Sequence, residues 1–208
     1  AKRGEMVVDF CAGAGGKTLA VGATMRNTGR LYAFDVSGHR LDALKPRLAR
    51  SGLSNVHPAA IAHERDDRVK RLAGKIDRVL VDAPCSGLGT LRRNPDLKWR
   101  QSPKAVEELT AKQTSILASA ARLLKPGGRL VYATCSILPE ENEAIAEAFS
   151  AAHPDFELLD AGELLAQLKV EGAQGLCSGG ASGSGYLRLW PHVHQTDGFF
   201  AAVWTRKR

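Results

Sequence analysis

The sequence predicts an α/β fold built on a doubly wound, mostly parallel sheet. Three observations support this prediction. Apolar runs rich in β-branched residues recur along the 208-residue chain, and stretches typical of helices separate the first five of them. A glycine-rich turn, CAGAGGKT, joins the first run to the first helical stretch. Acidic or cysteine residues stand where several runs end, which is where open parallel sheets bind their ligands.

Each element has its own signal. The expected strands are the apolar runs at residues 6–10, 31–36, 55–61, 79–82, 130–134 and 199–204. The expected helices are the stretches at residues 17–25, 38–51, 67–72, 104–124 and 139–152. The fourth helix is well delimited, because Ser102-Pro103 is a typical helix start and Pro126-Gly127 a typical stop. A turn at Thr196-Asp197-Gly198 precedes the last strand, and the glycine- and serine-rich run 179–185 is expected to be a flexible loop.

Length and composition favour one globular domain over residues 1–208. The chain is 44% hydrophobic and 25% charged, which suits a domain with a buried core. No apolar run reaches the roughly 20 residues that span a bilayer, and the first residues do not form a secretion signal. We therefore expect a cytoplasmic protein and no membrane partner. Because the chain begins without Met, we expect a piece of a longer protein; the sequence does not set the oligomeric state, and a monomer is the expectation.

Charge and cysteine content narrow the function classes. The net charge of +7 favours a polyanionic partner such as nucleic acid, although solvated helix surfaces would give the same excess. The four cysteines lie far apart without a C-x-x-C pair, which disfavours structural zinc and a disulfide scaffold. Two interpretations of the four cysteines remain: they are buried small side chains, or they are reactive thiols. We expect no metal site, and a pair formed by His192 and His194 is the one alternative.

The glycine-rich turn fits neither of two common nucleotide-binding loops. A P-loop has a glycine five residues before Gly16, where this chain has Cys11, and Thr18 replaces the third glycine of a dinucleotide loop. Asp35 ends the second expected strand, about 20 residues after Gly15, where an acidic side chain accepts hydrogen bonds from ribose hydroxyls. S-adenosylmethionine fits both features, because it carries a ribose and no phosphate. A tight turn without any ligand is the alternative.

Two cysteines follow expected strands. Cys85, in DAPCSG, comes after the fourth strand, and Cys135, in ATCS, comes after the fifth. If strands one, four and five are neighbours, both cysteines face the crevice beside the glycine-rich turn. A thiolate near a methyl donor has a specific use, because its addition to carbon 6 of a pyrimidine makes carbon 5 nucleophilic. The spacing alone does not order the two cysteines.

Five longer motifs extend these signals over nearly the whole chain, from Met6 to Trp204. They are VVDFCAGAGGKT, FDVSGHRL, DRVLVDAPCSGLGTLRRNPDLKW, YATCSILPEENE and TDGFFAAVW. Together they resemble the bacterial RsmB-like branch of the RNA (cytosine-5)-methyltransferases, the Sun/NSUN-type family. The resemblance implies a Rossmann-like class I S-adenosylmethionine-dependent methyltransferase fold. Its sheet would have seven mostly parallel strands, helices on both faces and an antiparallel last strand.

The resemblance also assigns residues to the cofactor, S-adenosyl-L-methionine. The glycine-rich turn would supply seven of them: Cys11, Ala12, Gly13, Ala14, Gly15, Gly16 and Lys17. Asp35 would bind the ribose, Asp82 would contact the cofactor, and Arg40 would lie near it. The family places an Asp near the adenine after the third strand. Asp66 and Asp67 both qualify, and we favour Asp66 because it keeps the D-x-R spacing.

For catalysis, the resemblance implies that Cys135 attacks the cytosine, that Cys85 assists product release, and that Asp82 steadies the ring. We expect methylation of carbon 5 of a cytosine in RNA, with 16S ribosomal RNA as the substrate. Methylation of tRNA, or a non-catalytic RNA-binding role in ribosome assembly, are the alternatives. The cysteine of Thr-Cys-Ser disfavours a DNA methyltransferase. We expect Arg92, Arg93 and Lys98 near the phosphates of the RNA.

The chain departs from the family pattern in two places. Gly13-Ala14 replaces the Ala-Pro of the usual CAAPGGKT loop, which loosens the loop without removing a hydrogen-bond donor. Family members also carry an RNA-binding region before the first strand, which this chain lacks. We therefore expect weaker substrate recognition by this piece alone.

Overall fold

The computed structural model describes residues 1–179 and 185–208, which form two compact units. The first unit comprises Ala1–Asp82, Ala118–Leu130 and Arg208, and the second comprises Ala83–Leu117 and Val131–Lys207. The helix α5 (Pro103–Ala121) and the strand β5 (Leu124–Thr134) each contribute residues to both units. The expected flexible loop at 179–185 lies mainly on residues 180–184, which are outside the described residues.

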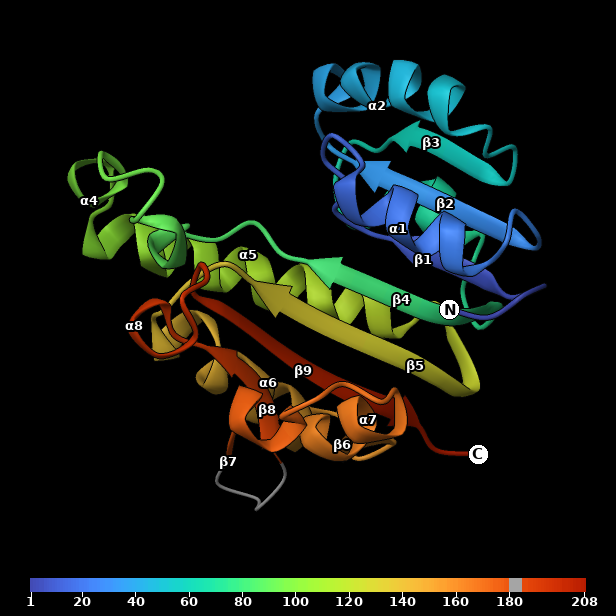
Figure 1. Ribbon diagram of the computed structural model, residues 1–208. Coiled ribbons are helices and arrows are strands. Elements are labelled where there is room, and N and C mark those ends of the chain that lie inside the picture. The colour runs from blue at the N-terminus through green and yellow to red at the C-terminus, as the bar shows by residue number, and fades with distance from the viewer. Residues whose placement is uncertain (180–184) are drawn as a thin grey trace. The chain divides into compact units, whose positions relative to one another are not determined.

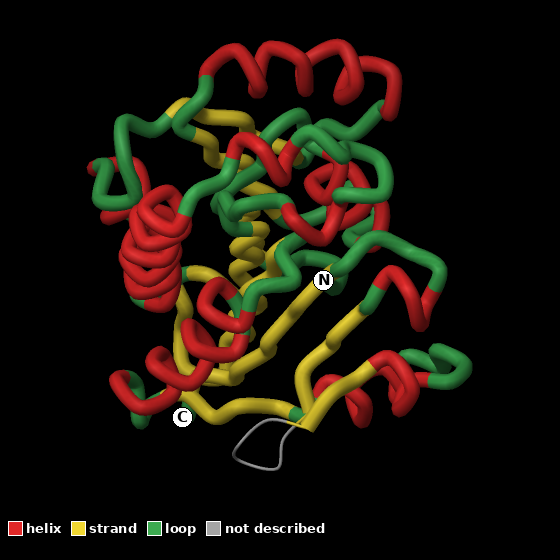
Figure 2. The backbone as a smooth tube through the Cα atoms, turned by 90° about the vertical axis from the view of Figure 1, so that its left-hand side faces the viewer, coloured by secondary structure: helices red, strands yellow, loops and turns green. Residues whose placement is uncertain are grey.

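The first unit is a parallel sheet with helices packed on its strands. Its strands run in the order β3-β2-β1-β4-β5, and the pairs β1–β2, β2–β3 and β1–β4 are parallel. Their bounds are Met6–Asp9 (β1), Arg30–Asp35 (β2), Val56–Ala60 (β3) and Ile76–Asp82 (β4). The helices are Gly16–Thr24 (α1), Gly38–Ser51 (α2) and Asp67–Lys70 (α3). In Figures 1 and 2, α2 runs along the outside of the strands β2 and β3.

Apolar side chains from these elements form one core, with Leu31 and Ala33 of β2 packed against Leu41 and Leu44 of α2. Burial of these side chains is the main force that holds the helices on the sheet. Local signals set the limits of α2, since the Ser37 side chain accepts a hydrogen bond from the Arg40 amide at its start. Residues 38–51 therefore form the predicted helix.

The second unit contains the antiparallel part of the fold. Its strand order is β5-β9-β8-β7, and β6 also pairs with β9. The strands are Phe156–Leu159 (β6), Cys177–Gly179 (β7), Gly185–Leu189 (β8) and Phe199–Arg206 (β9). The helical segments are Leu88–Thr90 (η1), Leu97–Arg100 (α4), Pro139–Glu141 (η2), Glu143–Ala152 (α6), Ala161–Gln167 (α7), Ala173–Leu176 (η3) and Pro191–His194 (α8). Helices α6 and α7 lie alongside β6, β8 and β9 (Figure 1).

One prediction about the sheet is confirmed and one is refined. The last strand is antiparallel to its neighbours, as predicted, because β9 pairs antiparallel with both β6 and β8. The described residues contain nine strands instead of seven. The β9 strand pairs with β8 through its first half and with β6 through its second half, so that two short strands fill one position. The short β7 then adds a further strand beside β8.

The fourth predicted helix ends earlier than expected, because β5 already begins at Leu124. Leu123 and Leu124 are fully buried. The stop signal Pro126-Gly127 therefore lies within the bounds of β5, where Gly127 has a φ of +78°. The helix therefore ends before the predicted stop signal, whereas the strand expected at residues 130–134 begins six residues earlier, at Leu124.

Candidate active site

The glycine-rich turn lies in the first unit, between the end of β1 and the start of α1. Ala12 donates its amide to the carbonyl of Phe34 at 2.8 Å, which ties the turn to β2. Gly15 has a φ of +85°, and a Cβ there would lie 2.1 Å from Leu44 Cδ1. Gly13 and Gly16 differ, because no atom lies within 4 Å of a Cβ added at either position. The turn is thus held firmly on its α2 side and leaves open space beside two glycines.

Asp35 joins this turn to the end of β2. Its Oδ2 accepts a hydrogen bond from the Gly13 amide at 2.8 Å, and its Oδ1 accepts one from the Ser37 amide at 2.8 Å. The residue is 6% exposed. A carboxylate has about four acceptor sites, so both oxygens keep capacity for hydroxyl donors. The position and chemistry of Asp35 therefore fit a ribose diol.

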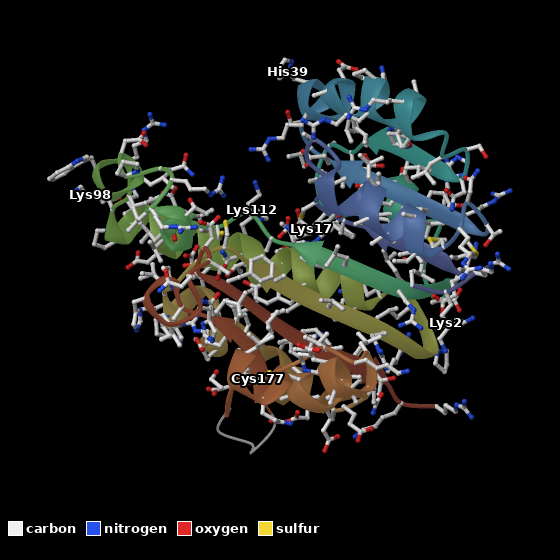
Figure 3. All side chains as sticks on the ribbon, viewed as in Figure 1. Lys2, Lys17, His39, Lys98, Lys112 and Cys177 are labelled. Carbon is white, nitrogen blue, oxygen red and sulfur yellow. The ribbon has the colours of Figure 1, made fainter. Side chains whose placement is uncertain are left out.

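Lys17 and Asp82 meet at the end of β4. The Lys17 Nζ lies 2.7 Å from Asp82 Oδ2, and both side chains are partly exposed. Figure 3 shows Lys17 reaching from the start of α1 toward that strand end. The pair joins two residues that the sequence assigned separately to the cofactor. It also leaves the Asp82 carboxylate with acceptor capacity, since the ammonium engages one oxygen.

The two remaining cofactor candidates are less closely tied to this group. Arg40 lies exposed in the first turn of α2, and its amide bonds to Ser37. Asp66 caps α3 and accepts hydrogen bonds from the amides of Ala62 and Arg68, which lower the pKa of its carboxyl. Asp67 is instead exposed. Asp66, the residue favoured by its spacing, thus holds the backbone of the segment after β3 through these two hydrogen bonds.

Asp9 belongs to the same unit, although sequence reasoning did not single it out. It ends β1, is 1% exposed, and accepts a hydrogen bond from the Thr18 hydroxyl at 2.7 Å. Burial raises its pKa to about 6, and the nearby Asp82 carboxylate adds to this effect. Its side chain fixes the start of α1 against β1 and so supports the turn between them. A buried aspartate at a strand end gives no sequence signal beyond its place in the motif.

The stability of the protein should report the state of Asp9. Because its pKa is raised in the fold, the folded state binds the proton more tightly than the unfolded state does. The stabilisation from protonated Asp9 is complete below about pH 4 and is lost as the pH rises through about 6. A two-unit shift corresponds to about 3 kcal/mol.

Urea unfolding of the full-length protein should therefore separate the wild type from Asp9→Asn. Between pH 6 and pH 4, the wild type should gain roughly 2 kcal/mol relative to the variant, because asparagine does not titrate. The same pH dependence in both proteins would show that Asp9 is not the titrating group.

The two predicted cysteines lie together in the second unit. Cys85 Sγ and Cys135 Sγ are 3.4 Å apart, well beyond the disulfide bond length of about 2.05 Å, and both are free thiols. The shared hydrogen bond and burial raise the pKa of Cys85 far above its ordinary value. Either thiol can donate in this contact between the two sulfurs, and the raised pKa of Cys85 favours its protonated form. The contact brings the two cysteines together but does not order their roles.

A buried glutamate holds the loops that carry the cysteines. Glu141 is 0% exposed, and its Oε1 accepts from the Ser86 amide at 2.8 Å and from Gln113 Nε2 at 3.0 Å. Its Oε2 accepts from the hydroxyls of Ser86 and Ser136, the residues that follow the two cysteines. The two hydroxyls lie 3.2 Å apart. One carboxylate thus connects both cysteine loops.

Backbone contacts add to this connection. The Cys135 carbonyl accepts a hydrogen bond from the Gly89 amide at 2.9 Å, and the Gly89 carbonyl accepts one from the Gly198 amide at 2.7 Å. A Cβ on Gly89 would lie 2.4 Å from the Gly198 oxygen. Asn142 donates to the Ser136 carbonyl at 3.0 Å. The loop after β4, the loop after β5 and the turn before β9 are therefore packed backbone to backbone.

The basic residues expected near RNA phosphates lie on the segment after Cys85. Arg92 and Lys98 are exposed. Arg93 is also exposed but is held by Asp197, at 2.8 Å from its Nε and 2.5 Å from its NH2 nitrogen.

His194 bonds through both ring nitrogens to backbone atoms of Trp190 and Gly175. Within residues 1–179 and 185–208, no group of three or more His, Cys, Asp or Glu side chains is placed to hold a metal ion.

No helix in the described part of the chain is long and apolar enough to cross a membrane.

The family model of the 16S rRNA methyltransferase RsmB/F matches residues 1–205. The probable ribosomal RNA small subunit methyltransferase B of Synechocystis sp. is 40% identical over 201 residues, which are 95% of this chain and 42% of that protein. The ribosomal RNA small subunit methyltransferase F of Escherichia coli is 36% identical over 95% of this chain and 39% of its own length. The chain thus spans about two fifths of these relatives.

Solved structures also match this chain over its whole length. The crystal structure of PH0851 matches with a TM-score of 0.86 and 39% identity, over 100% of this chain and 43% of that one. The structure of NSun6 from Pyrococcus horikoshii with SFG matches with a TM-score of 0.82 and 28% identity, over 100% and 49%. These matches confirm the predicted Rossmann-like methyltransferase fold. The chain belongs to the RsmB/F family of 16S rRNA methyltransferases.

Proposed function

We propose that the protein methylates carbon 5 of a cytosine in 16S ribosomal RNA, with S-adenosyl-L-methionine as the methyl donor. The observation that carries this proposal is the Cys85–Cys135 pair, with sulfurs 3.4 Å apart and the pKa of Cys85 raised by that contact and by burial. Residues 1–208 would act as one catalytic domain.

The first unit carries the groups that would hold the donor. Asp35 would accept hydrogen bonds from the ribose hydroxyls, and the open space beside Gly13 and Gly16 would admit the ligand close to the backbone. Lys17 keeps the Asp82 carboxylate in place at the end of β4. Arg40 and Asp66 would lie toward the adenosine. When bound, the donor supplies a methyl group on a positively charged sulfur.

The two cysteines would have different roles, with Cys135 attacking the cytosine and Cys85 assisting release of the product. The Cys135 thiolate forms a bond to carbon 6 of the cytosine and shifts an electron pair toward carbon 5, while Asp82 steadies the ring. After carbon 5 has received the methyl group, solvent water would take its proton, the electron pair of that carbon–hydrogen bond would re-form the double bond between carbons 5 and 6, and Cys135 would leave carbon 6 as a thiolate. Cys85 keeps a proton beside the departing sulfur and so stabilises it as a thiolate.

A methylation assay tests this function. The full-length protein is incubated with unmodified 16S rRNA, with tRNA and with DNA in the presence of labelled donor, and the product nucleoside is identified by mass spectrometry. We expect 5-methylcytidine in 16S rRNA. Methylation of tRNA would correct the substrate, and binding of 16S rRNA without methylation would favour a role in ribosome assembly.

Binding of the donor provides a separate test. Asp35→Ala should weaken binding of S-adenosylhomocysteine by roughly 10- to 100-fold, because a carboxylate with charge-assisted hydrogen bonds is lost. Asp42 is a suitable control, since it is an exposed carboxylate in α2 that pairs with Lys45. Calorimetry should give an unchanged dissociation constant for Asp42→Ala. Equal affinity of the wild type and Asp35→Ala would contradict the assignment.

A further inference from the structure

Trp99 is unusually exposed for a large aromatic side chain. It lies in α4 and is 81% exposed, and the other exposed large hydrophobic residues of the described chain are aliphatic. Its neighbour Lys98 places Nζ 4.9 Å from the ring centroid. Figure 3 shows Lys98 on the outer side of the α4 segment. A solvent-exposed indole beside a cation is suited to stacking on a base rather than to packing in a core.

The segment that carries Trp99 is anchored beside Cys85. Gln101 donates a hydrogen bond from Nε2 to the carbonyl of Ser86 at 2.8 Å. Leu97 packs on the same loop, because a Cβ added at Gly87 would lie 3.3 Å from Leu97 Cδ1. Asn94 bonds to the Thr90 hydroxyl at 3.1 Å. The indole is therefore exposed while its backbone is tied to the residues that follow Cys85.

The charge around Trp99 fits a polyanion. Between residues 92 and 104 the chain has five basic residues and one acidic residue. Asp96 pairs with Arg100 at 2.6 Å, and Arg93 pairs with Asp197. Arg92, Lys98 and Lys104 are exposed, and no ion pair is described for them anywhere in residues 1–179 and 185–208. No other exposed large hydrophobic residue is described in this segment, which disfavours an apolar protein interface.

We propose that Trp99 is a stacking platform for an unpaired nucleotide of the RNA next to the target cytosine. This proposal rests on the proposed function. A cytosine that leaves its stack to reach Cys135 deprives its neighbour of a stacking partner, and the indole replaces that partner. Lys98 and Arg92 neutralise the adjoining phosphates. The platform contacts the π-face of any base and therefore contributes affinity without base specificity.

The test uses the full-length protein and a fluorescently labelled 16S rRNA fragment, with affinity measured by anisotropy and methylation by labelled donor. Trp99→Ala should weaken RNA binding roughly tenfold and raise the KM for RNA, with kcat nearly unchanged. Trp99→Phe should restore most of the affinity, whereas Trp99→Leu should not. Because the side chain is exposed, none of these variants should impair folding. Leu168→Ala is the control, since Leu168 is an apolar residue that is 74% exposed outside this segment.

Salt dependence separates stacking from charge. Lys98→Ala should reduce the slope of log affinity against log salt by about 1, whereas Trp99→Ala should leave the slope unchanged. Wild-type affinity in Trp99→Ala, or equal affinities of Trp99→Leu and Trp99→Phe, would overturn the proposal while the wild type still methylates RNA. Failure of the wild type to bind or methylate the RNA would instead overturn the proposed function, and the platform with it.

Discussion

Replacing Cys135 with alanine is expected to abolish RNA methylation by the full-length protein, with a loss of roughly 10⁴-fold or more. Without the sulfur, no covalent bond to carbon 6 forms and carbon 5 stays a poor nucleophile. Cys177→Ala is the matched control, because Cys177 is a half-buried free cysteine of the same unit that bonds to the Ala173 carbonyl. It should keep wild-type activity. Labelled methyl incorporation measures both variants, and methylation that survives in Cys135→Ala would remove Cys135 from the nucleophile role.

Cys85→Ala should give a different defect. The variant keeps the attacking sulfur but loses the thiol 3.4 Å away, so release of the product should slow more than attack does. A covalent complex between protein and RNA should accumulate and appear as a shifted band on a denaturing gel. The double variant Cys85→Ala with Cys135→Ala should give no such band. Loss of activity in Cys85→Ala without any accumulated complex would count against a role in release.

Removing the Glu141 carboxylate is expected to have the largest effect on stability. Glu141→Ala removes four accepted hydrogen bonds, from the Ser86 amide, two serine hydroxyls and Gln113. The serine hydroxyls then have only each other as acceptors, and Gln113 keeps only the Pro84 carbonyl. The loss of these buried hydrogen bonds should cost roughly 3–5 kcal/mol of unfolding free energy. The neighbouring Glu140 is exposed, so Glu140→Ala should change stability by less than about 0.5 kcal/mol.

Urea unfolding measures the difference between these neighbours, and similar midpoints for both variants would contradict the network described for Glu141. Glu141→Gln adds a second readout. It keeps the side-chain volume but turns an amide group toward donors, so that the loops bearing the two cysteines should separate. Formation of the covalent RNA complex should then slow even under conditions where the variant remains folded.

Sequence reasoning could locate the parts of the site that depend on short motifs. The glycine-rich turn, Asp35 and the two cysteines were found because their residue types and strand-end positions have direct chemical meaning. The structure adds that Asp35 bonds to Gly13, that Lys17 bonds to Asp82, and that the two sulfurs are 3.4 Å apart. These contacts depend on how strands far apart in sequence are paired.

The buried carboxylates could not be predicted in the same way. Glu141 looked like one of several acidic residues at a helix start, and its neighbour Glu140 is indeed exposed. What distinguishes Glu141 is the convergence of Ser86, Ser136 and Gln113, which comes from three separate segments. Asp9 was missed for a related reason, because its raised pKa comes from burial at the end of β1.

The central claim, that Cys135 is the residue that bonds to the cytosine, can be measured directly with RNA that contains 5-fluorocytosine. Fluorine replaces the proton that must leave carbon 5, so the covalent complex persists after methyl transfer. The full-length protein is incubated with this RNA and the methyl donor, digested, and analysed by mass spectrometry. We expect a modified nucleotide on the peptide that contains Cys135 and none on the peptide that contains Cys85. A nucleotide attached to Cys85, or no adduct from a protein that methylates ordinary RNA, would contradict it.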